Sequence, residues 1–189
     1  MSAFLQALED RRPNEEWAAV SRFALVAWLV FYCGFLLYAA TTDANFLILD
    51  FVNLAIHEAG HPLFAAFGYI PNILGGTLLE LMVPAACALT FWWRRHTTGV
   101  AFSAFWFFEN FLYIGTYMAD ARRVSLPLVG SGDHDWEILF SHWNILVHDQ
   151  QIGGWTRAIG WMGLLGTLGW LVWRGLQTRS PARRPTLHS

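Results

Sequence analysis

Apolar residues in this chain gather into five long stretches that are separated by polar connections. The stretches are Phe23–Ala40, Phe46–Phe67, Ile73–Trp93, Gly99–Ala119 and Ile152–Trp173. Each is close to the roughly 20 residues that an α-helix needs to cross a bilayer. Trp and Tyr side chains lie near several of their ends, as they do at membrane–water interfaces. The pattern predicts an all-α fold, a polytopic membrane helix bundle.

The longest connection, Asp120–Asp149, has a different pattern. After a turn predicted at Gly130–Gly132, large apolar side chains recur at helical spacing, namely Trp136, Leu139, Phe140, Trp143, Leu146 and Val147. Polar residues occupy the opposite face, namely His134, Glu137, Ser141 and His148. This alternation is typical of an amphipathic helix that lies in the membrane interface. We expect that helix to cover a cavity in the bundle.

The two ends of the chain are polar. Pro13, followed by acidic residues, predicts the start of the first helix, because proline and acids both favour the first helical turn. The segment Arg174–Ser189 is rich in arginine and contains Pro181 and Pro185. It predicts a disordered tail, which leaves residues 1–173 as a single membrane-embedded domain.

Arginines gather at both ends and beside one connection. They are Arg11, Arg12 and Arg22 at the start, Arg94 and Arg95 after the third stretch, and Arg174, Arg179, Arg183 and Arg184 at the end. Because basic connections stay in the cytoplasm, all three regions are predicted on the cytoplasmic side. Five full crossings would separate the two ends, so we expect a broken or re-entrant segment around Gly68–Gly76. The connection Asp120–Asp149 would then face outside.

Composition supports a membrane protein. Of the 189 residues, 55% are hydrophobic and 14% charged, and the net charge is -2. Soluble domains carry about 25% charged residues. These values exclude a disordered chain, a nucleic-acid-binding protein and a disulfide-stapled mini-domain. We therefore expect membrane lipids as surroundings, no nucleic acid as a partner, and an integral protein of a bacterial cytoplasmic membrane.

The second apolar stretch carries the candidate chemistry. It is interrupted by Asp50, Asn53, His57, Glu58 and His61. Ionisable groups inside a membrane span cost several kcal/mol and usually have a function. On a helix, Asp50, Asn53, His57 and His61 would fall within roughly 80° of one another and form one polar stripe.

The segment His57–His61 reads His-Glu-Ala-Gly-His, an HExxH sequence. On a helix the two histidines lie one turn apart, so both imidazoles can bind one Zn²⁺. Glu58 can then reach a water molecule on the metal and take its proton, which predicts a general base. The alternative interpretation is a polar cluster that only packs against other helices.

With this motif inside a hydrophobic helix, and with Gly68, Gly75 and Gly76 after it, the sequence resembles the site-two protease class of intramembrane zinc metalloproteases. The resemblance covers about thirty residues. It implies His57 and His61 as zinc ligands, Glu58 as general base, a transmembrane peptide as substrate and a re-entrant element after the metal helix. Two features differ: Pro62, which favours a kink, directly follows the second histidine, and the class's Asp-Gly third-ligand motif is absent.

A catalytic zinc site needs three protein ligands. Glu109 matches the predicted depth of His57 best and is our first candidate for the third. Asp120 lies on the same helical face as Glu109, and His134 could act as a ligand or as a hydrogen-bond donor to the transition state. Glu80 is expected to hold another residue of the site in place.

The residues leave several functions open. The first, which we favour, is a membrane-embedded zinc-dependent hydrolase that acts as a peptidase. The second is a lipid hydrolase with the same metal chemistry. The third is a non-enzymatic membrane protein: an inactive protease relative, a scaffold, or a metal or proton carrier. A haem site is less favoured, because His57 and His61 lie on one helix and cannot bind opposite faces of one haem.

Overall fold

The computed structural model describes residues 16–42, 46–128 and 133–177. Over these residues the chain is all-α, with six α-helices and no strand. The α-helices are α2 (Arg22–Thr41), α3 (Asp50–Phe64), α4 (Tyr69–Trp93), α5 (Thr97–Asp120), α6 (Asp135–His142) and α7 (Asp149–Gln177). There are also two short 3-10 helices. η1 (Ala65–Phe67) directly follows α3, and η2 (Leu146–His148) directly precedes α7.

All five predicted apolar stretches contain helix, although residues 46–49 at the start of the second stretch lie before α3 and are not helical. Four of them correspond to α2, α4, α5 and α7, and the second becomes α3 followed by η1. α7 continues through Arg174 to Gln177, so the first four residues of the predicted tail are helical. Residues 178–189, the helix start predicted at Pro13 and the turn predicted at Gly130–Gly132 lie outside the described residues.

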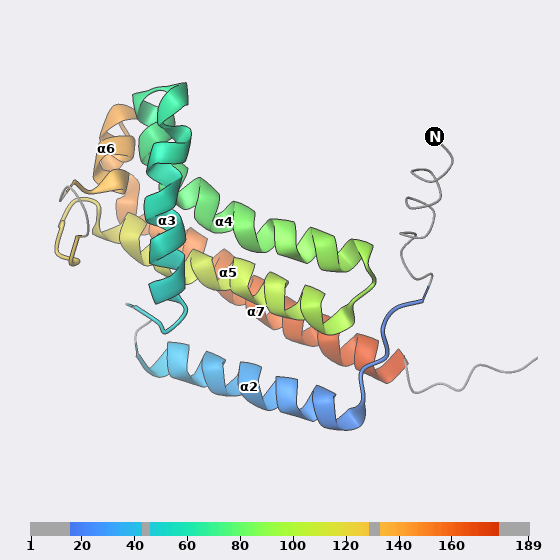
Figure 1. Cartoon of the computed structure of the whole chain (residues 1–189). Helices are drawn as coiled ribbons and strands as arrows, with labels where there is room; N and C mark the ends of the chain where they lie inside the picture. The colour runs from blue at the N-terminus through green and yellow to red at the C-terminus, as the bar shows by residue number, and fades with distance from the viewer. Residues whose placement is uncertain (1–15, 43–45, 129–132, 178–189) are drawn as a thin grey trace, which may run out of the picture.

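The four long helices α2, α4, α5 and α7 run along one another, whereas α3 stands across them at one end (Figure 1). α5 and α7 pack closely against each other, because glycines remove the side chains between them. A Cβ added at Gly115 would lie 2.6 Å from the carbonyl oxygen of Gly153. The core between α2, α5 and α7 is filled by large apolar side chains, among them Tyr32, Phe105 and Leu164.

Three arginine-bearing segments meet at the end away from α3. The Ala18 amide donates to the Arg95 carbonyl at 2.9 Å, and the Thr97 hydroxyl donates to the Ala18 carbonyl at 2.7 Å. The Arg174 guanidinium at the end of α7 lies 4.8 Å from the centroid of the Trp17 ring. The start of the described chain, the α4–α5 turn and the end of α7 are therefore neighbours.

The chain reverses direction between α3 and α4 at Gly68. This residue has φ 112°, which a glycine adopts without the strain of a side chain. Beyond the reversal, α3 packs on the first half of α4, and Gly60 faces the backbone of Gly75 and Gly76. The helix runs on through Pro62 to Phe64 before tightening into η1, so the backbone keeps its helical form at His61.

The predicted interfacial helix is shorter than expected and is held against the bundle. α6 ends at His142, and its residues Trp136, Leu139 and Phe140 are buried in a second apolar core with α4 and α5. Trp143 and Val147, which we had placed on the same apolar face, are exposed. α6 stops there because Asn144 takes a positive φ and the chain turns toward η2.

Two helices, α2 and α4, are long and apolar enough to cross a membrane, as judged by length and composition. Such helices also occur in the cores of soluble proteins, and α2 lies near the N-terminus as a signal sequence would. The measure by itself supports membrane association only weakly.

Candidate metal centre

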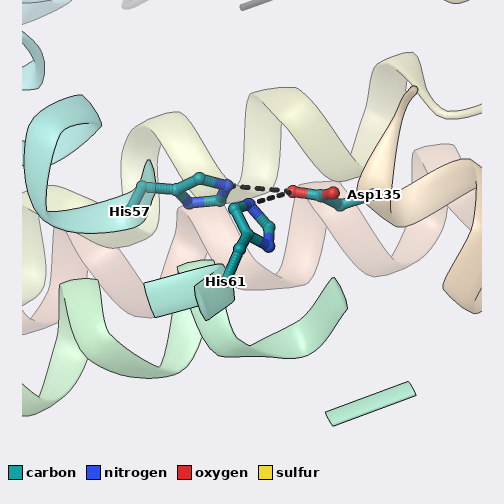
Figure 2. Close-up of side chains that lie close together, drawn as sticks. All are labelled: His57, His61 and Asp135. Carbon is teal, nitrogen blue, oxygen red and sulfur yellow. Dashed lines mark hydrogen bonds and ion pairs between the residues drawn. The ribbon is translucent and has the colours of Figure 1, made fainter. Parts of the chain in front are cut away.

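His57 and His61 face the same side of α3, as their spacing predicts, and meet Asp135 at the start of α6 (Figure 2). His57 Nε2 lies 2.9 Å from Asp135 Oδ2, and His61 Nε2 lies 3.6 Å from the same oxygen. One ligand atom from each residue can be chosen so that all three lie within 4.8 Å of one another. The group can therefore hold a metal ion.

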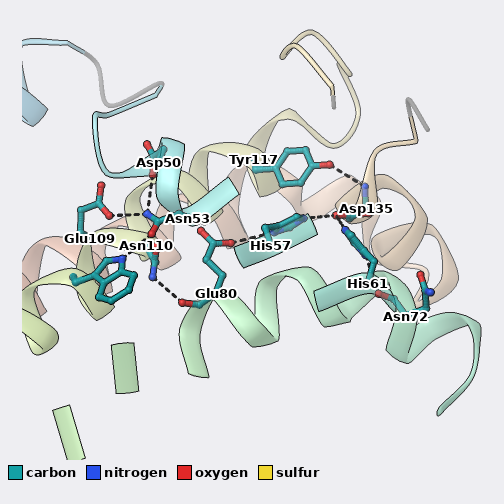
Figure 3. A network of polar contacts seen from close by, with 11 residues as sticks. Asp50, Asn53, His57, His61, Asn72, Glu80, Glu109, Asn110, Tyr117 and Asp135 are labelled. Atoms are coloured by element: carbon teal, nitrogen blue, oxygen red, sulfur yellow. Dashed lines mark hydrogen bonds and ion pairs between the residues drawn. The ribbon is translucent and has the colours of Figure 1, made fainter. Parts of the chain in front are cut away.

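The other ring nitrogen of each histidine faces an oxygen atom (Figure 3). His57 Nδ1 lies 3.1 Å from Glu80 Oε2, and His61 Nδ1 lies 2.9 Å from the backbone carbonyl oxygen of Asn72. Both oxygens are acceptors, so they favour the tautomer with the proton on Nδ1 and the lone pair on Nε2. Metal-bound histidines are commonly oriented in this way. The residue that Glu80 contacts, and whose ring it can orient, is thus His57.

Asp135 is held by the turn that begins α6. Its backbone N–H donates to the Tyr117 hydroxyl at 3.1 Å. The preceding residue, His134, caps the helix, because its Nδ1 accepts from the Glu137 amide at 3.2 Å. Burial lowers the pKa of His134, which favours the neutral imidazole that this cap requires. Its ring also lies 4.1 Å from the ring of Tyr117, centroid to centroid.

The candidate third ligands from the sequence lie elsewhere. Glu109 is fully buried, and its Oε2 accepts from the Asn53 amide at 3.0 Å. Asp120 accepts from the backbone amides of Ser125 and Leu126 and so shapes the connection after α5. His134 points its Nε2 toward Asp120 at 3.6 Å rather than toward the two histidines.

Asp135 was therefore missed, although it is the neighbour of His134 in the segment that the sequence singled out. Its position as the first residue of an amphipathic helix was a usable signal. Residues of a helix start point in different directions, however, and only the packing of α6 on α4 and α5 turns Asp135 toward α3. Sequence spacing carries no information about that packing.

The other polar residues of the α3 stripe form a second cluster, toward the interior of the bundle (Figure 3). The side-chain Nδ2 of Asn53 donates to Asp50 Oδ1 at 3.2 Å as well as to Glu109. Trp106 donates its indole N–H to the side-chain oxygen Oδ1 of Asn53 at 2.6 Å. All these residues except Trp106 are almost completely buried. The predicted stripe is thus divided, with its start facing Glu109 and its end facing Asp135.

A cavity of about 600 Å³ opens onto the three candidate ligands. Glu58 also lines it and is partly exposed, whereas His57 beside it is buried. Much of the remaining wall is apolar and comes from the segment before α3, from α3 and α4, and from the segment after α5: Phe46, Phe51, Leu54, Ile73, Leu126, Pro127 and Leu128. A substrate in this cavity would contact apolar walls around a single polar centre.

The donor set fits a small divalent cation. Two imidazole nitrogens and a carboxylate oxygen are a known ligand set of catalytic zinc, which keeps a further position for water or substrate. The cavity supplies space for that position. The arrangement can thus bind a metal in a cavity that Glu58 also lines. No family model, curated protein or solved structure matches the chain.

Proposed function

We propose that the chain is a membrane-embedded, zinc-dependent hydrolase that cleaves peptide bonds. One observation carries the proposal. His57, His61 and Asp135 converge on a cavity that Glu58 also lines. Both histidines are oriented by acceptors on Nδ1, which is the arrangement a metal needs. A polar cluster that only packs would not require this common orientation.

The placement in a bilayer is supported by the outer surface. Beyond the candidate spans α2 and α4, α7 exposes large apolar side chains, including Trp155, Met162 and Leu165. Contiguous apolar surface of this kind is uncommon on soluble proteins. We therefore place α2, α4, α5 and α7 across the membrane, with α3 as the re-entrant element. The arginine-bearing end would face the cytoplasm and the metal centre the other half of the bilayer.

Each residue of the site has a distinct part in the proposed reaction. A bound zinc ion would polarise the substrate carbonyl and lower the pKa of a water molecule. His57, His61 and Asp135 would hold the ion, and Glu80 and the Asn72 carbonyl keep the imidazoles oriented. Glu58 takes the proton of the attacking water and later passes it to the leaving amine. The apolar walls of the cavity exclude bulk water and favour an apolar stretch of peptide.

The proposal is tested by a single substitution. In Glu58→Gln we expect stoichiometric zinc, as in the unmodified protein, because Glu58 is not a ligand. We expect hydrolysis of apolar membrane peptides to fall at least about a hundredfold, the usual contribution of a general base. Zinc is measured by atomic absorption, and hydrolysis by mass spectrometry of the products. Purified protein without tightly bound metal would refute the proposal.

A second candidate is a metal or proton carrier, which the buried cluster of Asp50, Asn53 and Glu109 favours. Acidic residues inside a membrane bundle often mark ion pathways. In that case Glu58→Gln would leave function intact, whereas substitutions in the ligands or in Glu109 would abolish ion movement into vesicles. Products from lipid rather than peptide substrates would instead indicate a lipid hydrolase.

A further inference from the structure

Tyr117 lies beside the candidate metal centre, although the sequence pattern gave it no role there. It projects from α5 into the wall of the cavity that Glu58 and the candidate ligands also line. Its ring centroid is 6.4 Å from that of His57 and 4.1 Å from that of His134. Figure 3 shows its hydroxyl pointing toward Asp135. Two packed imidazoles and one hydrogen bond therefore fix the side chain in place.

The hydrogen bond at Tyr117 has a defined direction. The Asp135 backbone N–H is the donor at 3.1 Å, so the phenol oxygen accepts and keeps its own hydrogen. Within the described part of the chain, no acceptor takes this hydrogen. A phenol hydroxyl can donate and accept at the same time. The unused donor is therefore available to a group in the cavity.

We propose that Tyr117 is a catalytic residue that donates this hydrogen bond to the substrate oxygen on which negative charge develops. The inference rests on the proposed peptidase function. In the first step the water oxygen bonds to the carbonyl carbon, its proton moves to Glu58, and the carbonyl π electrons move to the oxygen. In the second step the C–N bond breaks, those electrons return, and Glu58 protonates the amine nitrogen. Tyr117 stabilises the oxygen anion between the two steps without giving up its proton.

Tyr117 could act in two ways that differ in a measurable property: it could donate a hydrogen bond to the substrate, or it could only position Asp135. A positioning role would act through the metal and would change zinc affinity. A donor acts on the charged oxygen and leaves zinc affinity unchanged. Preorganised donors of this kind are among the larger contributions to catalysis.

The test uses the full chain in detergent, loaded with zinc, and a phosphinic pseudo-dipeptide with apolar side chains. Its tetrahedral phosphinate carries negative charge where the reacting oxygen would carry it. By calorimetry we expect Tyr117→Phe to bind this probe about 10- to 100-fold more weakly, the usual effect of losing a hydrogen bond to a charged group. Zinc content should not change.

Tyr113→Phe is the matched control. Its ring stacks on Tyr117 at 6.1 Å and its hydroxyl makes no hydrogen bond to a candidate ligand. We expect a smaller loss of affinity there. In the unmodified protein, one carbon-13 Cζ tyrosine NMR signal should shift when the probe binds. That signal should persist in Tyr113→Phe.

Three results would overturn the inference. Equal probe binding by Tyr117→Phe and the unmodified protein would show that no donor is lost. Loss of zinc from Tyr117→Phe would show that the residue only positions Asp135. An NMR spectrum of the unmodified protein in which no tyrosine signal responds to the probe would show that no tyrosine donates a hydrogen bond to it. Unmodified protein that holds no zinc would instead overturn the proposed function itself, and this role with it.

Discussion

At the scale of single residues, the candidate metal centre includes a carboxylate that is 78 residues away from His57 in the chain. Asp135 faces both histidines, whereas Glu109 faces Asn53 and Asp50. Both acids are buried, and sequence reasoning favoured Glu109 because it lies in mid-span. Substitutions at Asp135 and at Glu109 should therefore have different effects on metal binding.

Asp135→Ala should raise the Kd for zinc by more than about 100-fold, beyond the loss that follows removal of an outer hydrogen-bond partner. Glu109→Gln, which keeps the size of the side chain, should leave the Kd unchanged. Competition with a chelating dye measures both values. If Glu109→Gln lost zinc and Asp135→Ala kept it, the third ligand predicted from the sequence would be the correct one.

At the scale of elements, the α3–α4 crossing positions the histidines. Gly60 and Gly75 let the two helices approach until backbone meets backbone. A Cβ on Gly76 would lie 2.6 Å from His57 Nε2, so the absence of a side chain there also makes room for the imidazole. The glycines that the sequence offered as a sign of a broken segment thus have a packing role.

Gly60→Ala should lower the free energy of unfolding by about 1 to 3 kcal/mol, since overpacking against a rigid backbone forces the helices apart. Gly166→Ala is the control, because nothing lies within 4 Å of the Cβ position on that glycine of α7. It should leave the stability unchanged or raise it by up to about 1 kcal/mol. Thermal unfolding in detergent compares the two, and equal effects would contradict the role of the crossing.

At the scale of the whole molecule, the four long helices alternate in direction along the bundle (Figure 1). Because α3 lies across one end, an even number of helices runs the full length. The arginine-bearing segments can then share one side, as their contacts around Trp17 show. If α2, α4, α5 and α7 cross the membrane as proposed, this arrangement would remove the conflict between five apolar stretches and two arginine-rich ends.

Single-cysteine variants can test the orientation after Cys33 and Cys87 are replaced by alanine. Arg94→Cys, in the α4–α5 turn, and Ser141→Cys, in α6, should react with a membrane-impermeant maleimide from opposite sides of sealed vesicles. Both positions are exposed and lie at opposite ends of the bundle (Figure 1). Labelling of both from the same side would contradict the placement of α2, α4, α5 and α7 across the bilayer.

The sequence alone determined the helices and half of the candidate site. Continuous apolar stretches of about 20 residues form helices if they enter a bilayer, because hydrogen bonds within the segment then satisfy its backbone. The His57–His61 spacing places both imidazoles on one helical face, since the helical period is a local property. Tertiary structure decided the rest: that α3 lies across the bundle, that α6 packs inward, and that Asp135 and Tyr117 meet the histidines. These features depend on contacts between distant segments, such as glycine on glycine at the α3–α4 crossing, which no local pattern specifies.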